Sequence, residues 1–129
     1  MAKELRQGHI GFLVAAASST AYQFHGLYVN SAGKWALAQA GQRSVGVLQN
    51  APGADQPCEV WVAPSVTKAV AGGVIAAGAG VSVNASGHFI AATDADHLVG
   101  VALDAAGASG DIFTLWLHYG GEFQLSSPA

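Results

Sequence analysis

The sequence has little charge. Asp, Glu, Lys and Arg make up 10% of its 129 residues, against roughly a quarter in an average soluble domain. The sequence has five basic and eight acidic residues, which gives a formal net charge of −3 at pH 7. Binding to a phosphate backbone needs a basic surplus, so this balance argues against a nucleic-acid partner. Disorder is also excluded, because 51% of the residues are hydrophobic and disordered chains combine low hydrophobicity with high net charge.

Cysteine and long apolar runs are also scarce. Cys58 is the one cysteine, which excludes an internal disulfide and a cysteine-based zinc cluster. The longest apolar run covers residues 10–17, far short of the ~20 residues that cross a bilayer. Lys3 and Arg6 precede this run as in a signal peptide, but Glu4 lies within the would-be basic region. We therefore expect no membrane partner, and a chain that stays in the cytoplasm where it is made.

Small residues and short apolar segments dominate what is present. The chain has 17 glycines, mixed with even more alanine, and a glycine costs a helix interior about 1 kcal/mol relative to alanine. Val, Ile, Phe, Tyr and Trp gather in short segments separated by Asn, Gly and Pro, a pattern typical of an all-β sandwich or barrel. We predict strands over residues 24–30, 34–38, 44–49, 58–63, 67–70, 80–84, 88–92, 98–103 and 112–118.

An internal repeat is the strongest feature of the sequence. Residues 26–54 match residues 80–108 without a gap, with 11 identities in 29 positions. The matches include the turn residues of a Val-Asn-x-x-Gly motif and a Val-Gly-Val motif. Two copies are too few for a solenoid. The repeat therefore predicts one domain with internal pseudo-two-fold symmetry, whose units, about 26–62 and 80–117, superpose.

The two Val-Gly-Val motifs lead to specific expectations. We expect Val45 with Val99, and Val47 with Val101, to be buried in equivalent strands. The intervening glycines, Gly46 and Gly100, indicate a bulge or a close approach of another backbone segment.

The repeat also sets the domain boundaries. We predict an extended N-terminal arm over residues 1–20, a β domain over 21–118 and a C-terminal tail over 119–129.

No motif for catalysis or metal binding is complete. None of the five histidines has a partner at metal-ligand spacing. The densest polar cluster, Asp94, Asp96 and His97, is interpreted as a turn between strands. Glycine-rich segments lack the spacing of a phosphate loop, and Asp111 stands where a nucleophile elbow needs glycine. We therefore expect no enzyme activity, no metal and no cofactor.

One alternative from another class rests on a lysine. Lys68 lies near the middle of the pseudo-symmetric chain, as does the modified lysine of lipoyl and biotinyl carrier domains. The residues around it, Val66, Thr67, Ala69 and Val70, do not match the acidic or Met flanks of those domains. A small β carrier or a carbohydrate-binding module stays open as the alternative, and a hydrolase with an unrecognised site is a third reading.

A set of small-residue motifs gives a family resemblance. These are the Val29–Gly33 turn, the stretches 45–53, 62–68 and 71–78, Val99–Leu103 and Ala108–Ile112. Over residues 26–117 the chain resembles the head decoration, or capsid cement, proteins of tailed bacteriophages. It departs from them in its three tryptophans and its longer ends.

The resemblance implies a structural virion protein without catalytic activity. It would bind the outside of an assembled capsid and stabilise it by bridging neighbouring major capsid subunits. The implied partners are the major capsid protein and further copies of the chain, as a trimer or alternatively a dimer. Candidate residues for these interfaces are Lys3, Glu4, Arg6, Trp35, Trp61, Phe89 and Trp116.

Overall fold

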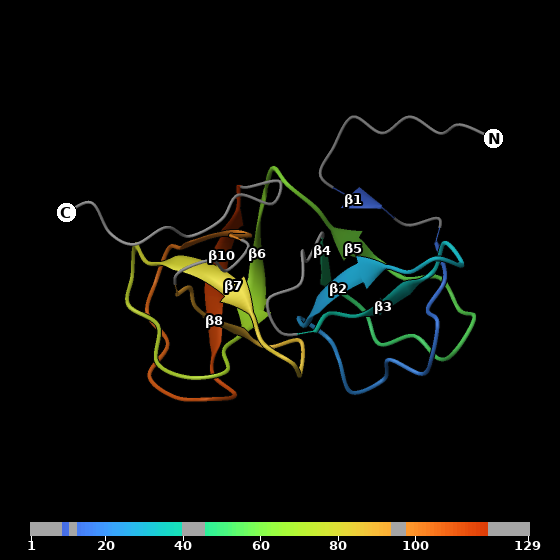
Figure 1. Cartoon of the computed structure of the whole chain (residues 1–129), viewed down its shortest axis with the longest axis horizontal. Helices are drawn as coiled ribbons and strands as arrows, with labels where there is room; N and C mark the ends of the chain where they lie inside the picture. Colours follow the sequence, from blue (N-terminus) through green and yellow to red (C-terminus); the bar gives the residue numbers. More distant parts are fainter. Residues whose placement is uncertain (1–8, 11–12, 40–45, 94–97, 119–129) are drawn as a thin grey trace.

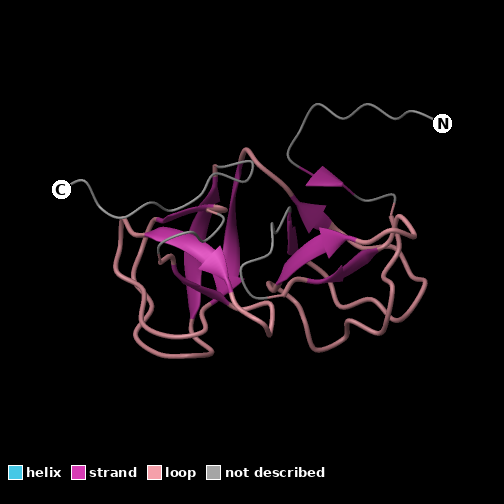
Figure 2. Cartoon of the chain, in the orientation of Figure 1, coloured by secondary structure: helices cyan, strands magenta, loops and turns pink. Residues whose placement is uncertain are grey.

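Every regular element in the described part of the chain is a β-strand (Figures 1 and 2). A computed structural model describes residues 9–10, 13–39, 46–93 and 98–118. The strands are β1 (His9–Ile10), β2 (Gly26–Val29), β3 (Trp35–Leu37), β4 (Gly46–Leu48), β5 (Val60–Trp61), β6 (Ser65–Val70), β7 (Gly80–Val83), β8 (Phe89–Ala91), β9 (Gly100–Ala102) and β10 (Ile112–Leu117). The all-β prediction is confirmed, and each predicted strand overlaps one observed strand from β2 to β10.

The strands form two antiparallel sheets with the same internal order. One sheet runs β1-β5-β4-β2-β3 and the other β6-β10-β9-β7-β8. We call residues 9–62 the first half and residues 65–118 the second half; they lie side by side in Figure 1. The predicted repeat is therefore present, and each unit is one strand longer than predicted. The added strand, β1 or β6, precedes the repeated sequence and completes its sheet.

The register of the two sheets matches residue for residue. Gly26 pairs with Val47 across β2 and β4, as Gly80 pairs with Val101 across β7 and β9. On β5, Trp61 lies opposite Val47 of β4. On β10, Trp116 lies opposite Val101 of β9 in the same way.

The hairpin turns of the two halves are built identically. Oδ1 of Asn30 accepts hydrogen bonds from the backbone N–H groups two and four residues later, at 3.0 and 3.1 Å. Oδ1 of Asn84 does the same at 2.9 and 3.1 Å. Gly33 and Gly87 close these turns with φ of 75° and 74°, a left-handed conformation that glycine adopts without steric cost. The repeated Asn and Gly residues thus fix equivalent turns.

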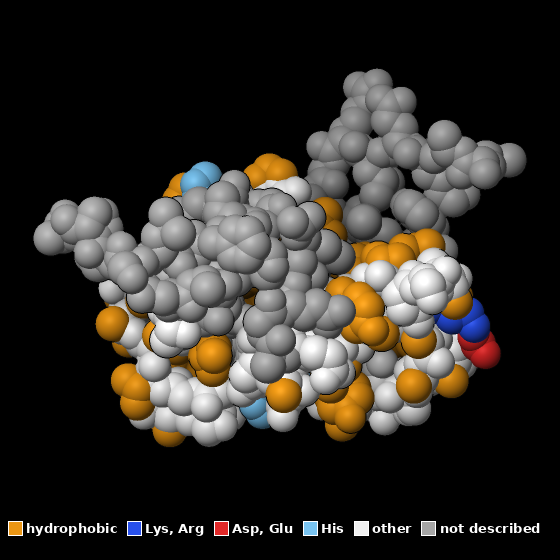
Figure 3. All heavy atoms as spheres, in the orientation of Figure 1, with side chains coloured by type: hydrophobic (Ala, Val, Ile, Leu, Met, Phe, Trp, Pro, Cys, Tyr) orange, Lys and Arg blue, Asp and Glu red, His pale blue; other side chains and the backbone are white. Residues whose placement is uncertain are grey.

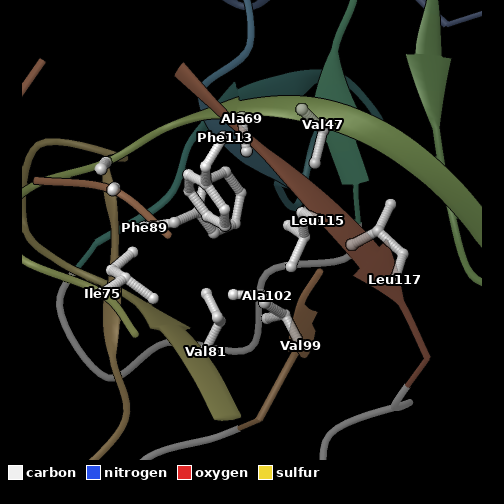
Figure 4. Packing of buried hydrophobic residues seen from close by; sticks show 12 residues of the cluster. Val47, Ala69, Ile75, Val81, Phe89, Val99, Ala102, Phe113, Leu115 and Leu117 are labelled. Atoms are coloured by element: carbon white, nitrogen blue, oxygen red, sulfur yellow. The ribbon is translucent and has the colours of Figure 1, made fainter. Parts of the chain in front are cut away.

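Each half has its own hydrophobic core. In the first half Trp35, 1% exposed, is its largest side chain; the others are Ala15, Leu27, Leu48, Cys58 and Val60. In the second half Phe89, 0% exposed, takes the equivalent place. Figure 4 shows it surrounded by Ile75, Val81, Phe113 and other apolar side chains. Equivalent aromatic rings on β3 and β8 therefore lie within the two close-packed cores.

The start of the domain differs from the prediction. His9–Ile10 pairs with Val60–Trp61, and Ala15 is fully buried against the first core. The boundary expected at residue 20 therefore lies closer to the N-terminus, because the segment before it supplies the edge strand of the first sheet. Residues 1–8 and the predicted tail, 119–129, lie outside the described residues.

The Val-Gly-Val motifs are only partly as expected. Val47 and Val99 are buried, and Val45 lies outside the described residues. Val101 is only half-buried, so its predicted burial is wrong. The close approach at the glycines is confirmed: a Cβ on Gly100 would lie 2.9 Å from the Trp116 carbonyl carbon.

Two further observations concern the cysteine and the membrane-spanning segments considered in the sequence analysis. Cys58 is buried, and burial raises the pKa of its thiol. Within the described residues there is no helix long and apolar enough to cross a membrane.

Candidate interaction surfaces

The two halves are joined by a face of the first sheet. Val47 on β4 points away from its own core and belongs to the core of the second half. Figure 4 shows it beside Ala69 and near Leu115. This contact buries Val47 completely. The equivalent strands β4 and β9 thus differ in burial, because among the described residues only β4 has a neighbour on this face.

Hydrogen bonds tie the same face to the second half. The bonds join Gly26 N to Gly87 O at 2.8 Å, Val70 N to Phe24 O at 3.1 Å, and Gln49 Nε2 to Thr67 Oγ1 at 2.7 Å. Two are between backbone groups, so they depend on close backbone approach more than on side-chain identity. We call the contact between the halves the internal junction.

Phe24 anchors this junction at a conformational cost. Its φ is 66°, whereas the equivalent residue of the second half is Gly78, with φ of 85°. A residue other than glycine loses roughly 1–2 kcal/mol in this region. The Phe24 ring packs against the second core, and burial of apolar side-chain surface offsets such a cost.

Three aromatic rings meet at the junction. His25, 8% exposed, lies 5.3 Å from the Tyr22 ring and 4.7 Å from the His88 ring, measured between centroids. Its Nδ1 lies 3.1 Å from the Gln23 carbonyl oxygen. Burial lowers the pKa of His25 below its ordinary value of 6.5, and the nearby His88 lowers it further, against the opposing effect of hydrogen bonds to backbone carbonyls. The junction therefore favours the neutral imidazole.

The equivalent face of the second half is open to solvent. Trp116 on β10 lies between Val66 on β6 and Val101 on β9, and Ile112 lies on the same face because alternate strand residues do. Val66, Ile112 and Trp116 are 55%, 50% and 38% exposed, and Leu103, just beyond β9, is 49% exposed. We call these five residues the open face.

The predicted interface residues divide into three groups. Trp61 and Trp116 are exposed, at 37% and 38%, and remain candidates. Trp35 and Phe89 are core residues, so their assignment to an interface is wrong: their strands turn the rings inward, where they pack against the other apolar side chains of each core. Lys3, Glu4 and Arg6 lie outside the described residues.

Sequence reasoning missed three apolar residues of the open face: Val66, Leu103 and Ile112. The alternation of apolar residues along β10 signals two faces but not which one is covered. Exposure in this sheet depends on the packing between the halves, which no local pattern reports.

The structure does not place Lys68 as in a carrier domain, and it forms no metal site among the described residues. Lys68 lies in the middle of β6, opposite Thr114 of β10, whereas a carrier lysine lies on a hairpin. Among the described residues no group of three His, Cys, Asp or Glu side chains forms a metal site. Asp94, Asp96 and His97 lie outside the described residues.

Comparison with known proteins yields a likeness in fold. No protein-family model and no curated protein sequence matches the chain. Among solved structures, the chain is similar to the N base of the head fiber protein gp8.5 of bacteriophage phi29. The TM-score is 0.68 at 15% identity, and the match covers 90% of this chain and 99% of that one. At this identity the match shows a shared fold.

Proposed function

We propose that this chain is a structural virion protein of a tailed bacteriophage. It binds the outside of the assembled capsid as a homo-oligomer and stabilises the shell by bridging neighbouring major capsid subunits. Its role is not enzymatic.

The structural likeness is the observation that carries this proposal. The similar protein is the base of a phage head fiber, and the match spans nearly the full length of both chains. Folds host unrelated functions, so the likeness supports the proposal only together with the surface of this chain. The capsid-cement resemblance of residues 26–117 points to the same part of a phage particle.

The surface suits contacts with protein. Figure 3 shows hydrophobic side chains over both halves of the visible face, with charged side chains of the described residues at one edge only. The exposed tryptophans, Trp61 and Trp116, are of the residue type most enriched among dominant interface contacts. A protein that binds only the assembled shell stabilises it by mass action.

Co-sedimentation tests the proposal. The purified chain is mixed with assembled heads made from the major capsid protein encoded near it, and separately with unassembled capsid protein. We expect the chain to sediment with heads, to ignore free subunits and to raise the temperature at which heads break down. Failure to bind heads at micromolar concentration would overturn the proposal and bring the carbohydrate-binding alternative forward.

A further inference from the structure

We propose that the second half of one chain binds the first half of another copy, head to tail, by repeating the internal junction. This inference deepens the homo-oligomer of the proposed function by naming its interface. It concerns self-association only, so it can be tested without a capsid.

The argument starts from the equivalence of the two halves. Phe24 N donates to Leu48 O at 2.6 Å, and at the equivalent place Gly78 N donates to Ala102 O at 2.7 Å. One step further on, the returning bonds to His25 and Ala79 carbonyl oxygens both measure 3.0 Å. The backbone at the junction in the first half therefore recurs in the second half.

Every junction residue of the first half then has a counterpart 54 positions later. Phe24, His25, Gly26, Leu37, Val47 and Gln49 correspond to Gly78, Ala79, Gly80, Ala91, Val101 and Leu103. None of the six counterparts is charged, and four are Gly or Ala. Small residues let a second backbone approach as closely as it does at the internal junction.

No described residue of the same chain covers these counterparts as the second half covers Val47. Val47 is fully buried, whereas Val101 is half-buried and Leu103 is 49% exposed. Gly78 and Ala91 are exposed too. The internal junction shows what covers this surface when a neighbour is present: the β6 strand and the hairpin turn of the next half.

The receiving turn is repeated as well. At the internal junction the receiving turn contains Gly87, where a Cβ would collide with the Leu37 side chain and lie 3.3 Å from Gly26 O. Its equivalent in the first half, Gly33, has nothing within 4 Å of the same Cβ position. The turn that binds a neighbour in one half is thus vacant in the other.

The predicted pseudo-two-fold axis is not present: Gly26 contacts Gly87, whereas Gly33, the equivalent of Gly87, has nothing within 4 Å of its Cβ position. The two halves are related head to tail, so the two vacant surfaces differ from each other. A contact between unlike surfaces is heterologous and leaves one of each free at the ends of a dimer. It closes only as a ring, or else continues as a filament. We therefore expect a ring of three or more copies, in which each chain contributes Leu103 to one neighbour and Gly33 to the other.

Two variants break the two sides separately. Leu103→Glu places a carboxylate in the donor surface, where it would be buried without a partner. Gly33→Asn adds a side chain to the receiving turn, and asparagine is among the residues that tolerate a left-handed conformation. The matched control is Val74→Glu, because Val74 is 73% exposed and lies outside both surfaces.

Light scattering coupled to gel filtration measures the mass of each protein. We expect wild type and Val74→Glu to form the same ring at micromolar concentration, and both other variants to self-associate at least about tenfold more weakly, since a buried unpaired charge or a lost close contact is costly at an interface. Circular dichroism confirms that each variant stays folded. Mixing Leu103→Glu with Gly33→Asn should restore a dimer, because one intact pair of surfaces then remains.

Several results would overturn the inference. A monomeric wild type, an unchanged mass for Leu103→Glu, or an equal loss with Val74→Glu would each do so. Mixed variants that stay monomeric would rule out a heterologous contact. If the ring forms but does not sediment with heads, the proposed function fails while this inference stands.

Discussion

Val47 and Val101 are equivalent residues with different surroundings, which makes them a test of the junction at the residue scale. Val47→Ala removes apolar volume from a fully buried site, so we expect a loss of on the order of 1–2 kcal/mol in the free energy of unfolding. Val101→Ala changes a half-buried site and should cost about 0.5 kcal/mol or less. Urea denaturation of both variants in the monomeric Leu103→Glu background measures the difference. Equal losses would show that Val47 does not join the halves.

Gly100 is expected to be the least replaceable glycine of the described strands. A Cβ there would collide with the Trp116 carbonyl oxygen and lie 3.2 Å from Leu115 Cδ1. Backbone in the middle of a paired strand cannot move aside cheaply, so Gly100→Ala should cost about 3 kcal/mol or more.

Two matched variants control this prediction. At Gly73 nothing lies within 4 Å of the added Cβ, so thermal melting of Gly73→Ala should be close to wild type. Gly46→Ala meets mainly the end of the Val60 side chain, which can rotate, and should fall between the two. A Gly100→Ala variant as stable as wild type would contradict the close approach.

At the scale of elements, the turns were predictable and the edge strand β1 was not. The Asn and Gly residues of the two hairpins recur at a fixed spacing, and each has a local role that sequence reveals. The strand β1 is two residues long, and its place in the sheet is set by pairing with β5 rather than by its own composition. The repeat was therefore found from residue 26 onward, although each unit begins earlier.

The interface candidates show the same limit. Trp35 and Phe89 resemble Trp61 and Trp116 in sequence, since all four are aromatic residues in short apolar strands. Their opposite burial depends on which face of the sheet meets a core, and a one-residue shift in register would exchange the faces. The exposed set became visible only once the pairing of β6, β9 and β10 was known.

The junction between the sheets should respond to pH through His25. Its pKa in the folded state is lowered, mainly by burial, from an ordinary value of 6.5. Below that pH the unfolded chain binds a proton more readily than the folded chain, so unfolding becomes more favourable as pH falls. The stabilisation is fully present above pH 6.5 and is lost as pH falls through the lowered pKa.

Urea titrations from pH 8 to pH 5 measure this effect. We expect the free energy of unfolding of wild type to fall below pH 6.5, and the fall to be smaller in His25→Phe, which keeps an aromatic ring but cannot titrate. His118→Gln is the control, because His118 is exposed and stacks on Trp116 outside the junction. A His25→Phe profile that matches wild type would assign the pH dependence to other groups.

At the scale of the whole molecule, duplication explains why one chain carries two unlike surfaces. Each half has a face that covers a neighbour and a turn that receives one. Inside the chain, the face of the first half packs against the turn of the second half at the internal junction. The remaining face and turn belong to different halves, and the proposed ring would bring them together between neighbouring copies.

Attachment to a capsid and self-association should therefore be separable. The self-interface proposed here is apolar, whereas Lys3, Glu4 and Arg6 are the charged interface candidates of the sequence. Contacts between exposed charges are screened over about 10 Å at 0.1 M salt. Deleting Met1–Gln7 should weaken binding to assembled heads about tenfold, equivalent to ~1.4 kcal/mol, and should leave the ring intact.

Raising the salt to 1 M should also weaken the binding of wild type to heads, without changing the mass of the ring. Co-sedimentation and light scattering on the same samples decide the matter: unchanged head binding after the deletion would remove these residues from the capsid interface, and a lost ring would place them in the self-interface instead.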